Sequence, residues 1–223
     1  MLELNQLRKD LEAMENSILF ALSERSRFML NNNIYMPGAT GIPGLSLFGF
    51  MLRATEELHA KLGNYLSAED VPFSNNLPKP IIKKELVAIN LKPTCINLNQ
   101  EVMLIYKNLI PKLCRKGDDG CYVLTATLDI NALQLISRRV HYGFLIAESK
   151  YLSDTNSYRK LIETKNKDGL LKKLTNHNAE RVVLERVTKK ARSYNLKPEL
   201  VLWLYKNVIS LTKKAELMYL LQR

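Results

Sequence analysis

The sequence predicts an all-α fold, and three observations carry this prediction. Glycine and proline are scarce, with 9 and 8 copies in 223 residues, and they cluster in a few places. Between these clusters, apolar residues recur at steps of three and four, which is the spacing of one helix face. The chain shows no ladder of alternating segments, and its best strand candidate, residues 122–127, stands alone. A chain of this length buries roughly 70% of its unfolded surface, so we expect one large helical domain.

The first half of the chain contains three predicted helices. Residues 1–35 lack glycine and proline and carry one apolar stripe, which predicts a long amphipathic helix. A loop rich in both residues separates it from a second helix at about 45–62. Prolines make residues 66–95 an irregular connection. A third helix is expected at about 99–113, and Pro111 should end or kink it.

The second half is more densely helical. From residue 129 to about 152 the chain has one glycine and no proline, and its apolar side chains share a face, which predicts a long helix. Shorter helices follow at about 156–165 and 168–175, then a longer one at about 178–194. After Asn195 and Pro198 the last predicted helix runs from about 199 to the end.

Composition and motifs exclude several classes of protein. No stretch approaches about 18 consecutive apolar residues, so no transmembrane helix is predicted. Three cysteines without a CxxC pair give neither a disulfide framework nor a zinc signature, and we expect no metal or cofactor. No P-loop, GxGxxG, GxSxG or HExxH pattern occurs. The charged start does not look like a secretory leader, which favours a cytoplasmic protein; a secreted or plastid one is the alternative if a leader was removed.

The charge is distributed unevenly along the chain. The 33 basic and 22 acidic residues give a net charge of +11. Residues 1–110 are neutral overall, whereas residues 111–223 carry the whole excess. We therefore expect a partner with negative charge, either a polyanion or a small anionic metabolite.

Several polar residues stand where helix amphipathicity does not require them. Arg139 and Lys150 are eleven residues apart, so on one helix they share a face about 16 Å apart along its axis. Asn176 and Glu180 form an i,i+4 pair if the turn before their helix is helical.

Arg8, near the start of the first helix, and a second i,i+4 pair, Thr212 and Glu216, complete this set. Each pair alone is typical of a solvated helix face. Glu216 is the exception, because a carboxylate among apolar neighbours is costly unless it is paired or protonated.

These polar residues lie within blocks that resemble a known family. The segments SRRVHYG at 137–143 and AESKY at 147–151 resemble the S-R-R-[IV]-H-[FY]-G and A-E-x-K-[FY] block of the eukaryotic, all-helical chorismate mutases of yeast and plants. Further similar blocks are LRKDL at 7–11 with ENSI at 15–18, ERSRF at 24–28, VPF at 71–73, GDD at 117–119 and LTKKAELMYLL at 211–221. Six blocks in the right order make the resemblance specific.

The resemblance implies an enzyme that converts chorismate to prephenate by an intramolecular Claisen rearrangement, in the synthesis of phenylalanine and tyrosine. It implies a site of seven residues: Arg8, Arg139, Lys150, Asn176, Glu180, Thr212 and Glu216. The two arginines would bind the substrate carboxylates, with Asn176 and Thr212 completing these contacts. Lys150 would donate to the ether oxygen and to a nearby carboxylate, and a protonated Glu216 would donate to the same ether oxygen. Glu180 would accept from the ring hydroxyl.

Four positions depart from the regulated members of that family. Where fungal members carry two adjacent arginines this chain has Gly63 and Asn64, and where they have a small pair it has Val123 and Leu124. In those relatives the arginine holds the effector's carboxylate and the small pair admits its ammonium end. We therefore expect a degenerate effector site, with weak or absent control by tyrosine and tryptophan.

The resemblance also implies the organisation of the chain. It predicts a single domain over residues 1–223, with catalytic helices at about 1–30, 129–152, 156–194 and 199–223. The degenerate regulatory and dimer part would span about 36–125. Within it, residues 36–62 and 99–115 would form the face of a homodimer.

Two other functions are open to this sequence. A pI of about 9.5 and a basic run would suit a nucleic acid, the run being Lys172, Lys173, Arg181, Arg186, Lys189, Lys190 and Arg192. Against this, no helix-turn-helix or RNA-binding motif occurs and aromatic residues are only 8%. The other alternative is a catalytically silent relative that serves as a binding protein. We expect chorismate as the small-molecule partner, and neither nucleic acid nor membrane.

Overall fold

The computed structural model describes residues 4–82 and 91–223, and the regular structure within these ranges is helical. The helices are α1 (Leu4–Ser26), α2 (Leu47–Lys61), α3 (Asn99–Leu113), α4 (Tyr122–His141), α5 (Gly143–Ser153), α6 (Thr155–Glu163), α7 (Lys167–Leu174), α8 (His177–Ser193) and α9 (Pro198–Gln222), with 3₁₀ turns η1 (Asn32–Tyr35) and η2 (Asn64–Leu66). The predicted all-α class is confirmed. In the described ranges no helix is long and apolar enough to cross a membrane.

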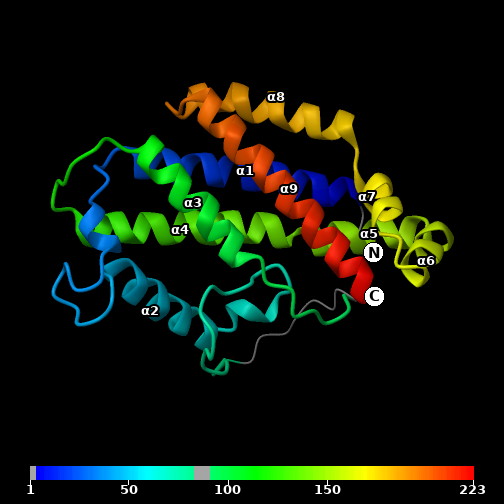
Figure 1. Ribbon diagram of the computed structural model, residues 1–223, viewed down its shortest axis with the longest axis horizontal. Helices are drawn as coiled ribbons and strands as arrows, with labels where there is room; N and C mark the ends of the chain where they lie inside the picture. Colours follow the sequence, from blue (N-terminus) through cyan, green and yellow to red (C-terminus); the bar gives the residue numbers. More distant parts are fainter. Residues whose placement is uncertain (1–3, 83–90) are drawn as a thin grey trace.

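The long helices form one elongated bundle (Figure 1). Helices α1, α4, α8 and α9 run along its length, with α3 packed on α4 and α9. The short helices α6 and α7 close one end, and α2 packs on α4 away from α8. The core lies where α1, α4 and α9 meet, and Leu19, Leu133 and Val208 are fully buried there. This packing, rather than intrinsic helix propensity, supplies most of the stability of such helices.

Three local predictions are corrected. Residues 122–127, the best strand candidate, are the first turns of α4, because Ala126 and Asp129 fall on its buried face at helical spacing. The helix expected over 129–152 is interrupted at Tyr142, which separates α4 from α5. Helix α1 ends at Ser26 rather than near residue 30 or 35, and Asn31 then takes a left-handed conformation with φ of 51°. Residues 83–90 of the predicted connection lie outside the described ranges.

Pro111 agrees with its prediction in part. It lies inside the last turn of α3, and the helix ends at Leu113. The other end of α3 is attached to α4. The backbone N–H of Leu98, the residue before α3, donates to Nε2 of His141 at 3.0 Å. Burial lowers the pKa of His141 to about 4, so the ring is a neutral acceptor near neutral pH. This bond joins α3 to the end of α4 that carries Arg139.

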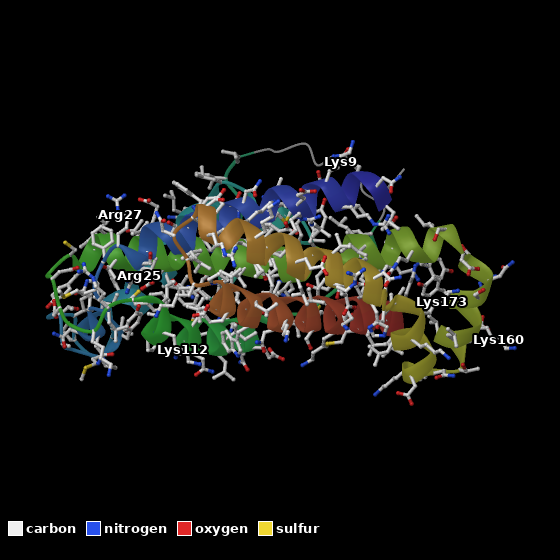
Figure 2. All side chains as sticks on the ribbon, turned by 90° about the horizontal axis from the view of Figure 1, so that it is seen from above. Lys9, Arg25, Arg27, Lys112, Lys160 and Lys173 are labelled. Carbon is white, nitrogen blue, oxygen red and sulfur yellow. The ribbon has the colours of Figure 1, made fainter. Side chains whose placement is uncertain are left out.

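A buried ion pair fixes the other end of the bundle. Nε of Arg25 on α1 donates to Oδ1 of Asp129 on α4 at 2.6 Å, and both side chains are fully buried. The hydroxyls of Tyr35 and Tyr106 also donate to Asp129, at 2.5 and 2.7 Å. Burial raises the pKa of Asp129, while Arg25 and the tyrosines oppose that rise. Arg25 lies far from Lys173 at the opposite end, as Figure 2 shows.

Candidate active site

A cavity of about 690 Å³ opens between α1, α4, α5, α7, α8 and α9. All seven residues predicted for the site line it: Arg8, Arg139, Lys150, Asn176, Glu180, Thr212 and Glu216. They come from five helices and from the residue before α8, so the tertiary structure brings together side chains up to 208 positions apart. Apolar side chains also line the cavity, including Leu7, Ile146 and Val183.

Arg139, at the end of α4, supplies a buried cation. It is 4% exposed, and its Nη1 donates to Oγ1 of Thr212 on α9 at 3.1 Å. Burial lowers the pKa of Arg139, opposed by Tyr205, Glu15 and Glu216, yet guanidinium stays charged in proteins. Its buried Nε has no hydrogen-bond partner among the described residues. A buried guanidinium with spare N–H groups beside a cavity is suited to bind a carboxylate.

Lys150 and Glu216 form the second charged element of the cavity. Nζ of Lys150 on α5 donates to Oε2 of Glu216 on α9 at 2.8 Å, and also to the carbonyl oxygen of Leu174. Glu216 is 4% exposed. Burial raises its pKa, Lys150 and Arg139 lower it, and Glu180 across the cavity raises it again. Lys150 is thus held against a carboxyl group whose burial favours the protonated form.

The i,i+4 pairing of Asn176 and Glu180 depends on a helical turn before α8, and the structure does not meet this condition. Asn176 is the N-cap of α8 in an extended conformation, so the two are not an i,i+4 pair on one helix. Oδ1 of Asn176 accepts from the backbone N–H of Ala179 at 3.0 Å, which leaves its amide N–H groups as donors. Glu180 lies in the first turn of α8 and still reaches the cavity, so both residues line it as predicted.

The sequence reasoning missed a further cation, Lys213. It lies between the predicted residues of α9, lines the cavity, and its Nζ is 3.1 Å from Oε1 of Glu180. It is part of the T-K-x-x-E block, but spacing alone gave it no role because it could equally face solvent. Arg8, by contrast, is an exposed residue of α1, and its Nη1 is 3.4 Å from Oδ1 of Asn5. The cavity therefore has a buried side, where Arg139 lies, and a more open side, where Arg8 lies.

Gly143 permits the close contact between α5 and α9 that shapes the cavity. A Cβ at this position would lie 2.8 Å from the backbone oxygen of Thr212 and 3.3 Å from Cβ of Ala215. Backbone atoms cannot move away as a flexible side chain can, so only glycine fits without a shift of one helix. The absent side chain thereby sets the position of Thr212 relative to Arg139.

The fold and the cavity define a class of protein: an all-helical protein with a cavity suited to a small organic dianion. Two arginines suit two carboxylates, and a lysine beside a buried carboxyl group can donate to an oxygen that becomes negative.

Comparisons with known proteins identify the family. A family profile described as Chorismate mutase type II matches residues 122–217. The chain is 35% identical to the chorismate mutase of Schizosaccharomyces pombe over 242 residues, which cover 100% of this chain and 96% of that one.

Among solved structures, Aro7p chorismate mutase from Candida albicans in complex with L-Trp aligns with a TM-score of 0.90 at 35% identity, covering 100% and 92% of the chains. AtCM1 with tyrosine bound in its allosteric site also aligns with a TM-score of 0.90, at 36% identity, covering 99% and 96%. The chain belongs to the chorismate mutase family.

We predict that Gly143→Ala will impair the site. The added methyl group must displace the backbone of Thr212, and overpacking of this kind costs about 1–3 kcal/mol. We expect turnover of chorismate to fall at least about tenfold at a temperature where the variant is folded, because small displacements of catalytic groups are costly. Steady-state kinetics and thermal unfolding measure the two effects.

Gly49→Ala is the matched control for this substitution. Gly49 lies in α2 outside the cavity, and its nearest neighbour would be the flexible side-chain oxygen of Ser46. Gly143→Ala with wild-type kinetics would show that the close approach of α5 to α9 is not needed.

Proposed function

We propose that this chain catalyses the conversion of chorismate to prephenate, in phenylalanine and tyrosine biosynthesis. The observation that carries the proposal is the meeting of all seven predicted residues in one cavity. The full-length similarity to chorismate mutases supports it. We also propose the seven residue roles and the division of the single domain into catalytic and regulatory parts.

The reaction needs positioning and charge stabilisation. Chorismate carries two carboxylates, and the transition state places negative charge on the ether oxygen as the C–O bond breaks. Arg139, held by Thr212, and Arg8 on the open side would bind the carboxylates and fix the reactive conformation of the substrate. Pre-oriented donors at the ether oxygen then stabilise the charge that develops there.

Lys150 and Glu216 would be these two donors. They meet at 2.8 Å on facing helices, so a single oxygen placed in the cavity can contact both. Lys150 donates as an ammonium group, and Glu216 donates only when it holds a proton. Glu180, on α8, would accept a hydrogen bond from the ring hydroxyl of chorismate and so orient the ring of the substrate.

We predict saturable conversion of chorismate by the purified protein and its loss in Arg139→Ala. Removing the buried guanidinium should lower kcat/KM at least about a hundredfold, because it orients the substrate and stabilises the transition state. Ultraviolet absorbance follows chorismate consumption directly. The control is Arg138→Ala: Arg138 is the adjacent residue, its side chain is 47% exposed, and it pairs with Glu69 and Asp70.

Equal activity of these two arginine variants would contradict the role given to Arg139. No turnover by folded wild-type protein would instead favour the catalytically silent alternative.

The protonated form of Glu216 gives the reaction a pH dependence. Burial raises the pKa of Glu216 above its ordinary 4.5, so the donor is present below that raised pKa and is lost as pH increases through it. We therefore expect kcat/KM to fall toward alkaline pH in the wild type. Glu216→Gln keeps an N–H donor at every pH and should flatten this alkaline limb.

The measurement for Glu216 is kcat/KM between pH 4 and 9 for both proteins, with Glu101→Gln as a control outside the cavity. Identical profiles of wild type and Glu216→Gln would show that the proton on Glu216 is not used.

We also propose weak or absent control by tyrosine and tryptophan, and the solved relatives do not support this part. AtCM1 holds tyrosine in an allosteric site, and the Candida protein was solved with L-Trp. The proposal rests on this chain's own residues. Gly63 and Asn64 carry no charge for an effector carboxylate, and Gly63 has a φ of 74°, which an arginine would rarely adopt. Val123 and Leu124, at the start of α4, are larger than the small pair they replace.

The expected result is a chorismate saturation curve that shifts less than about twofold when tyrosine or tryptophan is added. Calorimetric titration of each amino acid provides a reading independent of turnover. A clear shift of the curve, or saturable heat of binding, would contradict the prediction.

We propose a homodimer joined through residues 36–62 and 99–115. The first of these segments exposes large apolar side chains, and so does α3: Met36, Leu45, Phe50, Leu58, Leu62 and Leu104 are 46–61% exposed. Neighbouring exposed apolar residues on a folded protein are typical of an interface. We further propose a cytoplasmic location; several plant relatives are named chloroplastic.

The structure disfavours the nucleic-acid alternative. Arg186 and Lys190 pair with Glu15, which is fully buried on α1, so these two cations hold α8 to α1. Lys173 pairs with Asp154, and Arg181 with Glu185. Four of the seven basic residues of the run are therefore paired with carboxylates, which weighs against a nucleic-acid partner.

A further inference from the structure

One face of α9 carries a series of polar contacts that extends beyond the cavity. Thr212, Glu216 and Tyr219 are spaced by four and three residues along one face of the helix, and Arg223, the C-cap residue, follows four residues after Tyr219. Thr212 contacts Arg139, and Glu216 contacts Lys150, both in the cavity. Tyr219 and Arg223 do not line the cavity, and they contact a different residue of α5.

That residue is Glu148, which is 2% exposed. Arg223 binds it with both prongs of its guanidinium: Nε donates to Oε2 at 2.9 Å and Nη2 donates to Oε1 at 2.8 Å. The hydroxyl of Tyr219 donates to Oε2 at 2.9 Å. The guanidinium of Arg223 also lies 3.6 Å from the ring centroid of Tyr151. A bidentate pair with a buried carboxylate is geometrically specific as well as strong.

The carboxylate of Glu148 is thus satisfied only when α5 and α9 lie in one relative position. A buried carboxylate without its partners would cost several kcal/mol, so any sliding or parting of the two helices is opposed. Tyr219 is itself held from behind, since its hydroxyl accepts from the backbone N–H of Lys92 at 3.2 Å. Figure 1 shows this end of α9 beside α5.

Glu148, Tyr219 and Arg223 together form a clamp between α5 and the end of α9. This clamp lies close in the chain to Lys150 and Glu216, the proposed donors to the ether oxygen. Glu148 is two residues from Lys150 on α5, and Tyr219 is three residues from Glu216 on α9. Residues that fix Glu148 to Tyr219 and Arg223 therefore fix the backbone segments that carry Lys150 and Glu216. We propose that Glu148 and Arg223 are positioning residues that set the separation of Lys150 and Glu216; this role rests on the proposed function.

The position of the clamp determines which kinetic constant it affects. Arg8 and Arg139 lie on α1 and α4, and Thr212, which holds Arg139, lies on α9 about three turns before Arg223. Loss of the clamp leaves their contacts with the substrate carboxylates in place, so KM changes little. The two donors act on charge that exists only in the transition state, and their displacement lowers kcat.

The test uses Arg223→Met, since the Arg223 side chain is 18% exposed and its loss disturbs the core less than a change at Glu148. We expect kcat to fall about tenfold or more, with KM within about twofold and with helical circular dichroism retained. Arg223→Lys, which keeps the charge but not the two-pronged geometry, should recover only part of the rate.

Lys214→Met is the matched control. Lys214 is also on α9 and forms an interhelical ion pair, with Glu101 on α3 at 2.8 Å, but does not line the cavity. It should keep wild-type kcat. A double variant distinguishes positioning from general destabilisation. In a Lys150→Met background, Arg223→Met should lower kcat by less than about twofold, because the pair of Lys150 and Glu216 that Arg223 positions is already lost.

The outcomes separate the two proposals. Turnover by wild type and Lys214→Met, with unchanged kcat in Arg223→Met, would overturn the clamp and leave the proposed function intact. An equal loss of kcat from Arg223→Met in both backgrounds would also overturn it. Absence of turnover in the folded wild type would overturn the proposed function, and the catalytic meaning of the clamp with it.

Discussion

The structure depends on the burial of charged groups between α9 and two of the helices that pack against it, α4 and α5. Arg139 and Glu216 are each 4% exposed, and each is matched by a group on another helix. Buried charges are tolerated only with partners in good geometry. The helices therefore cannot shift independently, and the relative positions of the groups around the cavity follow from this constraint. Because a buried charge without a partner is costly, the charged groups and their partners are confined to one arrangement.

Sterics and electrostatics act together along this contact. Gly143 lets α5 approach the backbone of Thr212, and the ion pair of Lys150 with Glu216 lies further along the same two helices. At the far end of the bundle, Arg25 and Asp129 join α1 to α4 by the same principle, without a cavity. One buried ion pair fixes the scaffold, and another, beside open volume, is available for chemistry. The difference lies in the neighbouring space rather than in the residue types.

The positive charge of the chain has two separate uses. Part of it is structural, since Arg186 and Lys190 compensate the buried Glu15 and so attach α8 to α1. The other part surrounds the cavity, where the basic residues Arg8, Arg139, Lys150, Lys173 and Lys213 outnumber the acidic residues Asp154, Glu180 and Glu216. This local excess of positive charge suits a dianionic substrate. Net charge alone could not distinguish this arrangement from a surface for a polyanion.

The sequence by itself determined the helical class and most helix positions, and motif resemblance predicted the seven residues proposed for the site. It succeeded because helix periodicity, glycine and proline positions, and contiguous motifs are local properties. It left residues 122–127 as a lone strand candidate, whereas these residues form the first turns of α4, with Ala126 buried. Only the tertiary structure decided that Asn176 caps α8, that Lys213 faces Glu180, and that Glu148 meets Arg223 across two helices. The last two are contacts between residues far apart in the chain, and whether such a side chain faces a partner or solvent depends on helix packing, which no local pattern encodes.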